Sequence, residues 1–346
     1  MNFKFGAHGL SARVFRLAAT IGLALTLGSA VQPRNMSKPV YPAIDFDGEL
    51  SVLTYNVKGL PWPIAKGRVD ALKQIGLRLS DLRMQGRHPE IIVLQEAFTN
   101  EAQAIAAEAG YRYVANGPSS EEKSTMTANV KDAQFSKNGS WLKGEGLGKW
   151  TNSGLQILSD FPITAVHTEP FPATACAGYD CLANKGVMMA HIYVEPLKTT
   201  IQIGNTHMNS KRHSMVSKDR RLYAYRRQVD AAHAFYRKYR DNRFPLIFGG
   251  DFNPGKMAKR QSILFSKDWP VNPTNDALRI LSKRTEMSAD AMSALERAAD
   301  WQFVEPGSIA DLQVRSAEIP FGFDPLGSSL SDHIGYSISY FIGRPE

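Results

Sequence analysis

The sequence contains very little cysteine: among its 346 residues there are two, Cys176 and Cys181, both within the stretch "CAGYDC". Because no further cysteine exists and His167 and His191 are not at finger spacing, the pair does not predict a structural zinc site. In an oxidising compartment, two thiols this close are expected to form a disulfide that closes a small loop. Two free thiols are the alternative.

Several catalytic motifs are also missing. No Gly-x-Ser-x-Gly turn occurs, which excludes a serine hydrolase with a nucleophile elbow. Neither a P-loop nor a dinucleotide-binding fingerprint is present. No repeat or low-complexity linker divides the chain, and a composition of 43% hydrophobic and 21% charged residues is that of one large globular domain.

Long apolar runs are absent apart from one near the amino terminus, "LAATIGLALTLGSA", residues 17–30. This run follows Lys4, Arg13 and Arg16, is too short to span a bilayer comfortably, and ends on small residues as secretory leaders do. The sequence therefore predicts a signal peptide at 1–30, an extension at 31–48 and one globular domain at 49–346. The mature protein is expected to be secreted or periplasmic.

Removal of this leader changes the net charge from +8 to +8 − 3 = +5. A basic balance is compatible with an anionic partner, either nucleic acid or a lipid surface, and equally with solubility alone. Much of the positive charge lies at 217–240, beside one apolar stripe at helical spacing. We interpret this segment as a helix that packs on the core and exposes a solvated basic face, and a nucleic-acid-binding patch is the alternative.

Short apolar strands alternate with amphipathic helices along the rest of the chain, which predicts an α/β fold. Strands are expected to begin at Leu50, Ile91, Gly154, Val187, Thr199, Pro245, Asp300 and Gly335. Helices are expected at 69–82, at 100–109, at 217–240 and as a pair between 276 and 299. Residues 117–149 and 315–330 are expected to be irregular loops, which at this length usually carry function or disorder.

Polar side chains stand at the ends of five predicted strands. In "IFGGDFN" an apolar run leads through two glycines to a carboxylate and a carboxamide, and the glycines allow a close approach of other groups. The residues at the five strand ends are Asn56, Glu96, His207, Asp251 with Asn253, and Asp332 with His333. Each alone can be a cap, a turn former or a buried histidine. Together they are costly to bury unless they pair or hold a cation.

This set of side chains suits one kind of chemistry. The oxygen atoms of Glu96 and Asn56 are ligands that Mg²⁺ prefers. His207 and His333 can hold or release protons near neutral pH, while Asp251 can orient a water and Asn253 can donate to an oxyanion. The set therefore predicts metal-assisted attack of water on phosphorus.

The ordered motifs "LTYNV", "VLQEAF", "GNTHMNS", "GGDFN" and "LSDH" resemble those of the endonuclease/exonuclease/phosphatase superfamily. The resemblance runs from about residue 50 to residue 341. It implies the deoxyribonuclease I-like fold, a four-layer α/β sandwich in which two packed mixed β-sheets are flanked by helices. It also implies a divalent cation, Mg²⁺ or alternatively Mn²⁺ or Co²⁺, bound by Asn56 and Glu96.

The resemblance further implies a role for each remaining residue. His207 would contact the phosphate and act as general acid, Asp251 and Asn253 would orient the nucleophile and a phosphoryl oxygen, and His333 beside Asp332 would be the base. The family places an acidic residue on the preceding strand to orient this histidine. Asp311 in "IADLQVRS" is the expected match, although Leu312 stands where the family has an aromatic residue, and Asp300 is the alternative.

The segment "CAGYDCLANKGVMMAHI" is similar to that of secreted bacterial sphingomyelinases, where a cysteine loop precedes Asn-Lys-Gly and a strand. It favours a phospholipid phosphodiesterase, expected to be monomeric, that meets a membrane surface through an exposed rim of Trp62, Phe321 and Phe323. A turn that binds nothing explains "NKG" equally well. The alternatives are a secreted nuclease or nucleotide phosphatase, which would bind nucleic acid or nucleotides, and an inactive binding module of the same fold.

Overall fold

The computed structural model describes residue 46 and residues 48–62, 64–211, 214–323 and 329–343. The predicted signal peptide at 1–30 lies outside the described residues, and so does the extension at 31–48 apart from residues 46 and 48. Within the described ranges, no helix combines the length and the apolar character needed to cross a membrane.

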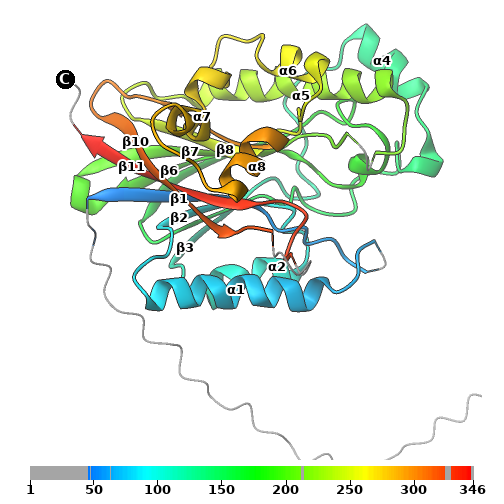
Figure 1. Ribbon diagram of the computed structural model, residues 1–346. Helices are drawn as coiled ribbons and strands as arrows, with labels where there is room; N and C mark the ends of the chain where they lie inside the picture. Colours follow the sequence, from blue (N-terminus) through cyan, green and yellow to red (C-terminus); the bar gives the residue numbers. More distant parts are fainter. Residues whose placement is uncertain (1–45, 47, 63, 212–213, 324–328, 344–346) are drawn as a thin grey trace, which may run out of the picture. The chain divides into compact units, whose positions relative to one another are not determined.

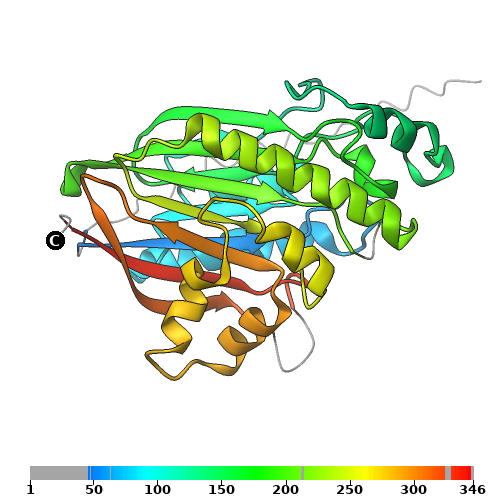
Figure 2. The ribbon, with the colours of Figure 1, turned by 90° about the horizontal axis from the view of Figure 1, so that it is seen from above.

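Two mixed β-sheets face each other at the centre of the fold (Figures 1 and 2). The six-stranded sheet has the order β10 (Asp311–Phe321), β11 (Gly335–Gly343), β1 (Glu49–Asn56), β2 (Ile91–Gln95), β4 (Gln156–Ser159) and β3 (Tyr113–Asn116). The five-stranded sheet has the order β5 (Ile163–Pro170), β6 (Gly186–Val194), β7 (Thr199–His207), β8 (Leu246–Asp251) and β9 (Asp300–Glu305).

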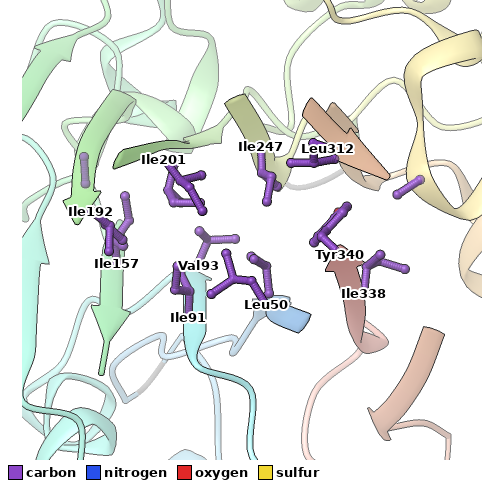
Figure 3. Close-up of a cluster of buried hydrophobic side chains, with 14 of the residues drawn as sticks. Leu50, Ile91, Val93, Ile157, Ile192, Ile201, Ile247, Leu312, Ile338 and Tyr340 are labelled. Atoms are coloured by element: carbon purple, nitrogen blue, oxygen red, sulfur yellow. The ribbon is translucent and has the colours of Figure 1, made fainter. Parts of the chain in front are cut away.

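A continuous apolar core holds the two sheets together (Figure 3). Ile91 and Val93 of β2 face Ile201 of β7 and Ile247 of β8, and all four side chains are fully buried. The sheets come so close that a Cβ added to Gly249 would lie 2.7 Å from a methyl carbon of Val93. Burial of this much apolar surface is the main force that joins the layers.

Helices cover the outer faces of both sheets and complete four layers (Figure 1). A second core packs the six-stranded sheet on α1 (Arg68–Met84), α2 (Asn100–Gln103) and α3 (Ile105–Glu108). A third packs the five-stranded sheet on α5 (Lys218–Tyr239) and α6 (Ala258–Leu264). The remaining helices are α4 (Val130–Lys137), α7 (Ala277–Ser282) and α8 (Ala289–Arg297). The predicted four-layer α/β sandwich is confirmed.

Two expected loops contain regular structure. The segment at 117–149 includes α4 and the 3₁₀ turn η1 (Trp141–Lys143), and the first part of the segment at 315–330, up to Phe321, belongs to the bulged strand β10. The expected helix at 100–109 divides into α2 and α3 at Ala104. The disulfide between Cys176 and Cys181 is present, and its loop includes the first residues of the 3₁₀ turn η2 (Gly178–Leu182).

Candidate active site

Strand register brings three ionisable side chains into one row at the edge of the five-stranded sheet. His207 at the end of β7 is the neighbour of Asp251 at the end of the parallel strand β8. Asp251 in turn is the neighbour of Asp300 at the start of the antiparallel strand β9. All three are nearly or fully buried. The glycine before Asp251 is needed here, because a Cβ on Gly250 would lie 2.3 Å from the Thr206 carbonyl oxygen.

Residues of the six-stranded sheet meet this row from across the core. Asn56 ends β1, and its amide nitrogen lies 3.1 Å from Glu96 Oε1 and 3.2 Å from Asp251 Oδ2. Glu96 follows β2 with a left-handed φ of 58°, and Asn253 has a φ of 54°. Strained backbone of this kind persists where the surroundings hold it and is concentrated at functional sites. The predicted pair of Asn56 and Glu96 is thus brought together.

Asp251 is the centre of the cluster. Its Oδ1 accepts a hydrogen bond from the Asn253 backbone N–H at 3.1 Å, and its Oδ2 accepts one from the Asn253 amide at 2.9 Å. Burial raises the pKa of Asp251 to about 7, and the adjacent Asp300 carboxylate contributes to the rise. The Glu96 carboxylate also raises the pKa of Asp251. Three carboxyl groups therefore meet at this point, and the charges of His333 and Lys185 partly offset the rise in the pKa of Asp251.

His333, just before β11, forms an ion pair with Asp300. Its Nδ1 lies 2.7 Å from Asp300 Oδ2, and its Nε2 lies 3.9 Å from Asp251 Oδ2. Burial opposes a charge on this ring, but the carboxylates of Asp300, Asp251 and Glu96 outweigh it and raise the pKa of His333 to about 10. Nδ1 is thus held by a carboxylate while Nε2 faces the centre of the site.

The expected partner of His333, Asp311, lies elsewhere. In the register of β10 with β11, Asp311 is opposite Gly343, whereas His333 precedes Gly335 at the other end of β11. The choice of Asp311 is therefore wrong, because β10 is antiparallel to β11 and begins far from the site. Asp332 also points away from the cluster: its half-exposed carboxylate pairs with Lys58 at 3.2 Å.

A buried lysine, which the strand-end pattern did not single out, contacts His207. Lys185 Nζ lies 3.1 Å from His207 Nε2 and 2.5 Å from Asp180 Oδ1, and Asp180 belongs to the disulfide loop. Burial lowers the pKa of His207, and the charges of Lys185 and His333 lower it further. An ammonium at this distance requires His207 Nε2 to accept, so the ring is neutral. Only the "NKG" stretch pointed to Lys185, and only as a clue to the substrate.

The chemistry of the donor set fits a hard divalent cation. Glu96 offers oxygen ligands beside the carboxylates of Asp251 and Asp300. Asn56 faces Glu96 with its amide nitrogen, and its Oδ1 accepts a hydrogen bond from the Lys58 backbone N–H at 3.0 Å, so the Asn56 oxygen would reach a cation only after the amide group turns over. Asp251, Asp300 and His333 also place one ligand atom each within 4.8 Å of one another. In that second group, however, His333 is already paired with Asp300, and a protonated imidazole is not a metal ligand.

Comparisons with known proteins agree with this geometry. Residues 53–253 match the model of the Endonuclease/Exonuclease/phosphatase family. Sphingomyelinase C from Streptomyces griseocarneus superimposes with a TM-score of 0.53 at 16% identity, over 84% of this chain and 99% of that one. A variant of beta toxin from Staphylococcus aureus with bound magnesium ions gives 0.53 at 16% identity, over 85% and 99%.

The fold is shared beyond these two proteins. D. rerio TDP2 complexed with a single-strand DNA product gives a TM-score of 0.54 at 13% identity, over 85% of this chain and 99% of that one. At these identities the similarity establishes the fold alone. A comparison with the sequences of characterised proteins finds no match.

Proposed function

Because the chain belongs to the endonuclease/exonuclease/phosphatase family, we propose that it is an exported metal-dependent phosphodiesterase, which hydrolyses phospholipids as sphingomyelinases do. The observation that carries this proposal is the row of His207, Asp251 and Asp300, which meets Glu96 and Asn56 from the other sheet. Export follows from the leader predicted at residues 1–30.

Glu96, assisted by Asn56, would hold the cation, since its carboxylate is more accessible than those of Asp251 and Asp300. When bound, Mg²⁺ supplies positive charge to the phosphoryl oxygens and balances the local carboxylates. Asp300, Asp251 and Glu96 keep His333 protonated, so His333 acts as a base only once Nε2 has lost its proton at higher pH.

The remaining residues have separate roles in water attack. His333 takes a proton from the water through Nε2, while Asp300 holds Nδ1 and stabilises the imidazolium that forms. Asp251 orients the water, and the Asn253 amide donates to a phosphoryl oxygen. On the other side, Lys185 places a positive charge next to His207. The Lys185 ammonium is the charged member of this pair, so it stabilises the leaving oxygen and donates a proton to it as the bond from phosphorus to that oxygen breaks. Neutral His207 holds Lys185 in place by accepting its hydrogen bond.

A lipid substrate is supported by the segment that carries Lys185. The disulfide loop positions Asp180, Asp180 holds Lys185, and Lys185 reaches His207, so this segment forms one wall of the site. The same segment resembles that of secreted sphingomyelinases, and sphingomyelinase C from Streptomyces griseocarneus has this fold. A nuclease is the second candidate, because TDP2 with bound single-strand DNA also has it.

One pair of assays in Mg²⁺ tests the proposal. Phosphocholine release from sphingomyelin vesicles is compared with degradation of plasmid DNA. We expect release from vesicles, its loss in excess chelator, and a decrease of at least about a hundredfold in the Glu96→Gln variant. Glu101→Gln, which removes an exposed acid of α2, is the matched control and should behave as wild type.

The other outcomes have distinct meanings. Cleavage of DNA with intact sphingomyelin would establish the nuclease. Full turnover in excess chelator would contradict the metal site. A folded protein with no activity on either substrate would indicate a binding module that lost its chemistry.

A further inference from the structure

Large apolar side chains are exposed on the segment between α4 and β4. Trp141, Leu142 and Trp150 are 67%, 69% and 70% exposed, and Leu147 is also exposed. Tyr179 and Met215 lie against this segment with exposed side chains. We call the six together the apolar rim: Trp141, Leu142, Leu147, Trp150, Tyr179 and Met215. Exposed apolar groups in this number mark an interaction surface.

Polar contacts hold the rim together and leave its apolar side chains exposed. The Tyr179 hydroxyl is 3.5 Å from the Leu142 carbonyl oxygen, and Lys143 Nζ donates to the Met215 carbonyl oxygen at 2.6 Å. The backbone N–H of Trp150 donates to the Leu182 carbonyl oxygen at 2.7 Å. Three segments of the chain are thus fixed as one surface by contacts that do not use the indole rings.

The rim lies next to the candidate site. Tyr179 directly precedes Asp180, which holds Lys185. The segment with α4 and the loop between β1 and α1 lie at the same end of the described domain in both views (Figures 1 and 2). That loop adds Trp62, 78% exposed. Phe321, by contrast, is buried in a stack on Tyr55, and Phe323 is partly buried, so neither forms the exposed rim predicted from the sequence.

The exposed charges on residues 130–150 all have one sign. Residues 130–150 include two acids, Asp132 and Glu145, and both are buried in ion pairs with arginines of α5. Lys131, Lys137 and Lys143 are exposed on the same segment. The outer surface of this segment therefore combines tryptophan with lysine and has no exposed carboxylate.

We propose that the apolar rim docks the protein on the surface of a lipid bilayer that contains anionic lipid. Tryptophan is favoured at the boundary between water and hydrocarbon, and lysines beside it are attracted to anionic headgroups. When the protein docks through the rim, the end of the two sheets that carries the candidate active site faces the bilayer. The choice of a lipid partner rests on the proposed function.

Vesicle binding without turnover tests the rim. The full-length protein is sedimented in chelator with vesicles of sphingomyelin and phosphatidylcholine, with and without phosphatidylserine. We expect the double variant Trp141→Ser, Trp150→Ser to lower the partition coefficient by about tenfold per tryptophan. Phosphatidylserine should strengthen wild-type binding, and less so when Lys131 and Lys137 are both changed to Gln.

The matched control removes two exposed apolar side chains from the end of the domain remote from the site. Met84 ends α1, Ile309 lies beyond β9, and they are 57% and 52% exposed. Met84→Ser with Ile309→Ser should bind vesicles as wild type does. Equal binding by the rim variant, or an equal loss in the control, would overturn the proposal.

Two further readouts separate this inference from the proposed function. The rim variant should hydrolyse a soluble phosphodiester, p-nitrophenyl phosphorylcholine, as fast as wild type, and a parallel loss there would contradict a docking role. If the rim variant lost binding to single-stranded DNA but not to vesicles, the partner would be nucleic acid and the proposal wrong. If wild type bound vesicles through the rim without cleaving sphingomyelin, the proposed function would fail while the docking surface stood.

Discussion

Two buried clusters of ionisable side chains lie in different parts of this fold, and they differ in how their charges are balanced. In the first, between α1 and β4, both Asp160 oxygens face the Arg83 guanidinium at 2.9 and 3.0 Å, and His88 lies 2.8 Å from Oδ2. Arg83 also donates to the Ala109 carbonyl oxygen and lies over the Tyr111 ring. The buried negative charge of Asp160 is thus paired directly with the positive charge of Arg83.

The second cluster is the candidate site, where like charges converge. Asp251 and Asp300 are cross-strand neighbours, Glu96 approaches from the other sheet, and the pKa values of Asp251 and His333 are raised in consequence. Folding alone does not require such an arrangement, because it costs free energy in the absence of a cation or a substrate. The balanced cluster is therefore expected to serve stability and the unbalanced one chemistry.

The largest effect should come from breaking the ion pair of the site. Asp300→Asn removes the carboxylate that orients His333, and we expect kcat to fall about a thousandfold. Because Asp300 raises the pKa of His333, the rise of activity with pH should move to lower pH in this variant. The matched change Asp311→Asn should leave both the rate and the pH profile unaltered. Equal losses in the two variants would contradict the assignment.

Breaking the balanced cluster should instead lower stability. Arg83→Met leaves the buried Asp160 without its main partner, and we expect the free energy of unfolding to fall by about 3 kcal/mol. The rate per folded molecule should not change. Urea unfolding measures the first quantity and steady-state kinetics the second. Arg87→Met, which removes an exposed arginine paired with Glu318, is the control, with an expected change under about 0.5 kcal/mol.

The sequence identified the central strands well and the edge strands poorly. The strands with continuous apolar runs, such as β2 and β8, were predicted because both of their faces are buried. The three strands not predicted, β3, β5 and β10, are all at sheet edges. Their exposed positions interrupt the apolar pattern, and β10 is also bulged.

Prediction of the site depended on strand direction. Asn56, His207 and Asp251 end their strands, so the apolar run that precedes each of them predicts its place at the edge of a sheet. Asp300 begins β9 and Lys185 precedes β6, and these strands run antiparallel to β8 and β7, so their beginnings lie at the site. Strand direction is a property of the sheet and is not encoded in any local stretch of sequence.

Asp276 tests whether a raised pKa alone marks a functional residue. It caps α7, accepting a hydrogen bond from the Arg279 backbone N–H at 3.1 Å, and burial raises its pKa to about 7. A carboxyl group whose pKa is higher in the folded state stabilises the fold below its unfolded pKa of about 4, and this stabilisation is lost as pH rises through about 7. Asp276→Asn keeps a side chain that can cap and removes the titration.

We therefore expect the Asp276→Asn substitution to flatten the dependence of unfolding free energy on pH between about 4 and about 7. At about pH 8 the variant should be more stable than wild type by about 1–2 kcal/mol, with an unchanged kcat. Chemical denaturation at several pH values measures the difference, with Asp219→Asn, an exposed acid of α5, as control. Burial raises the pKa of Asp276 without help from another carboxylate, whereas carboxylates contribute to the raised pKa of Asp251. A large loss of activity in the Asp276→Asn variant would therefore show that burial of a single acid is enough to identify a functional residue. An unchanged rate would indicate that a raised pKa identifies a functional residue only where several carboxylates lie close together, as they do around Asp251.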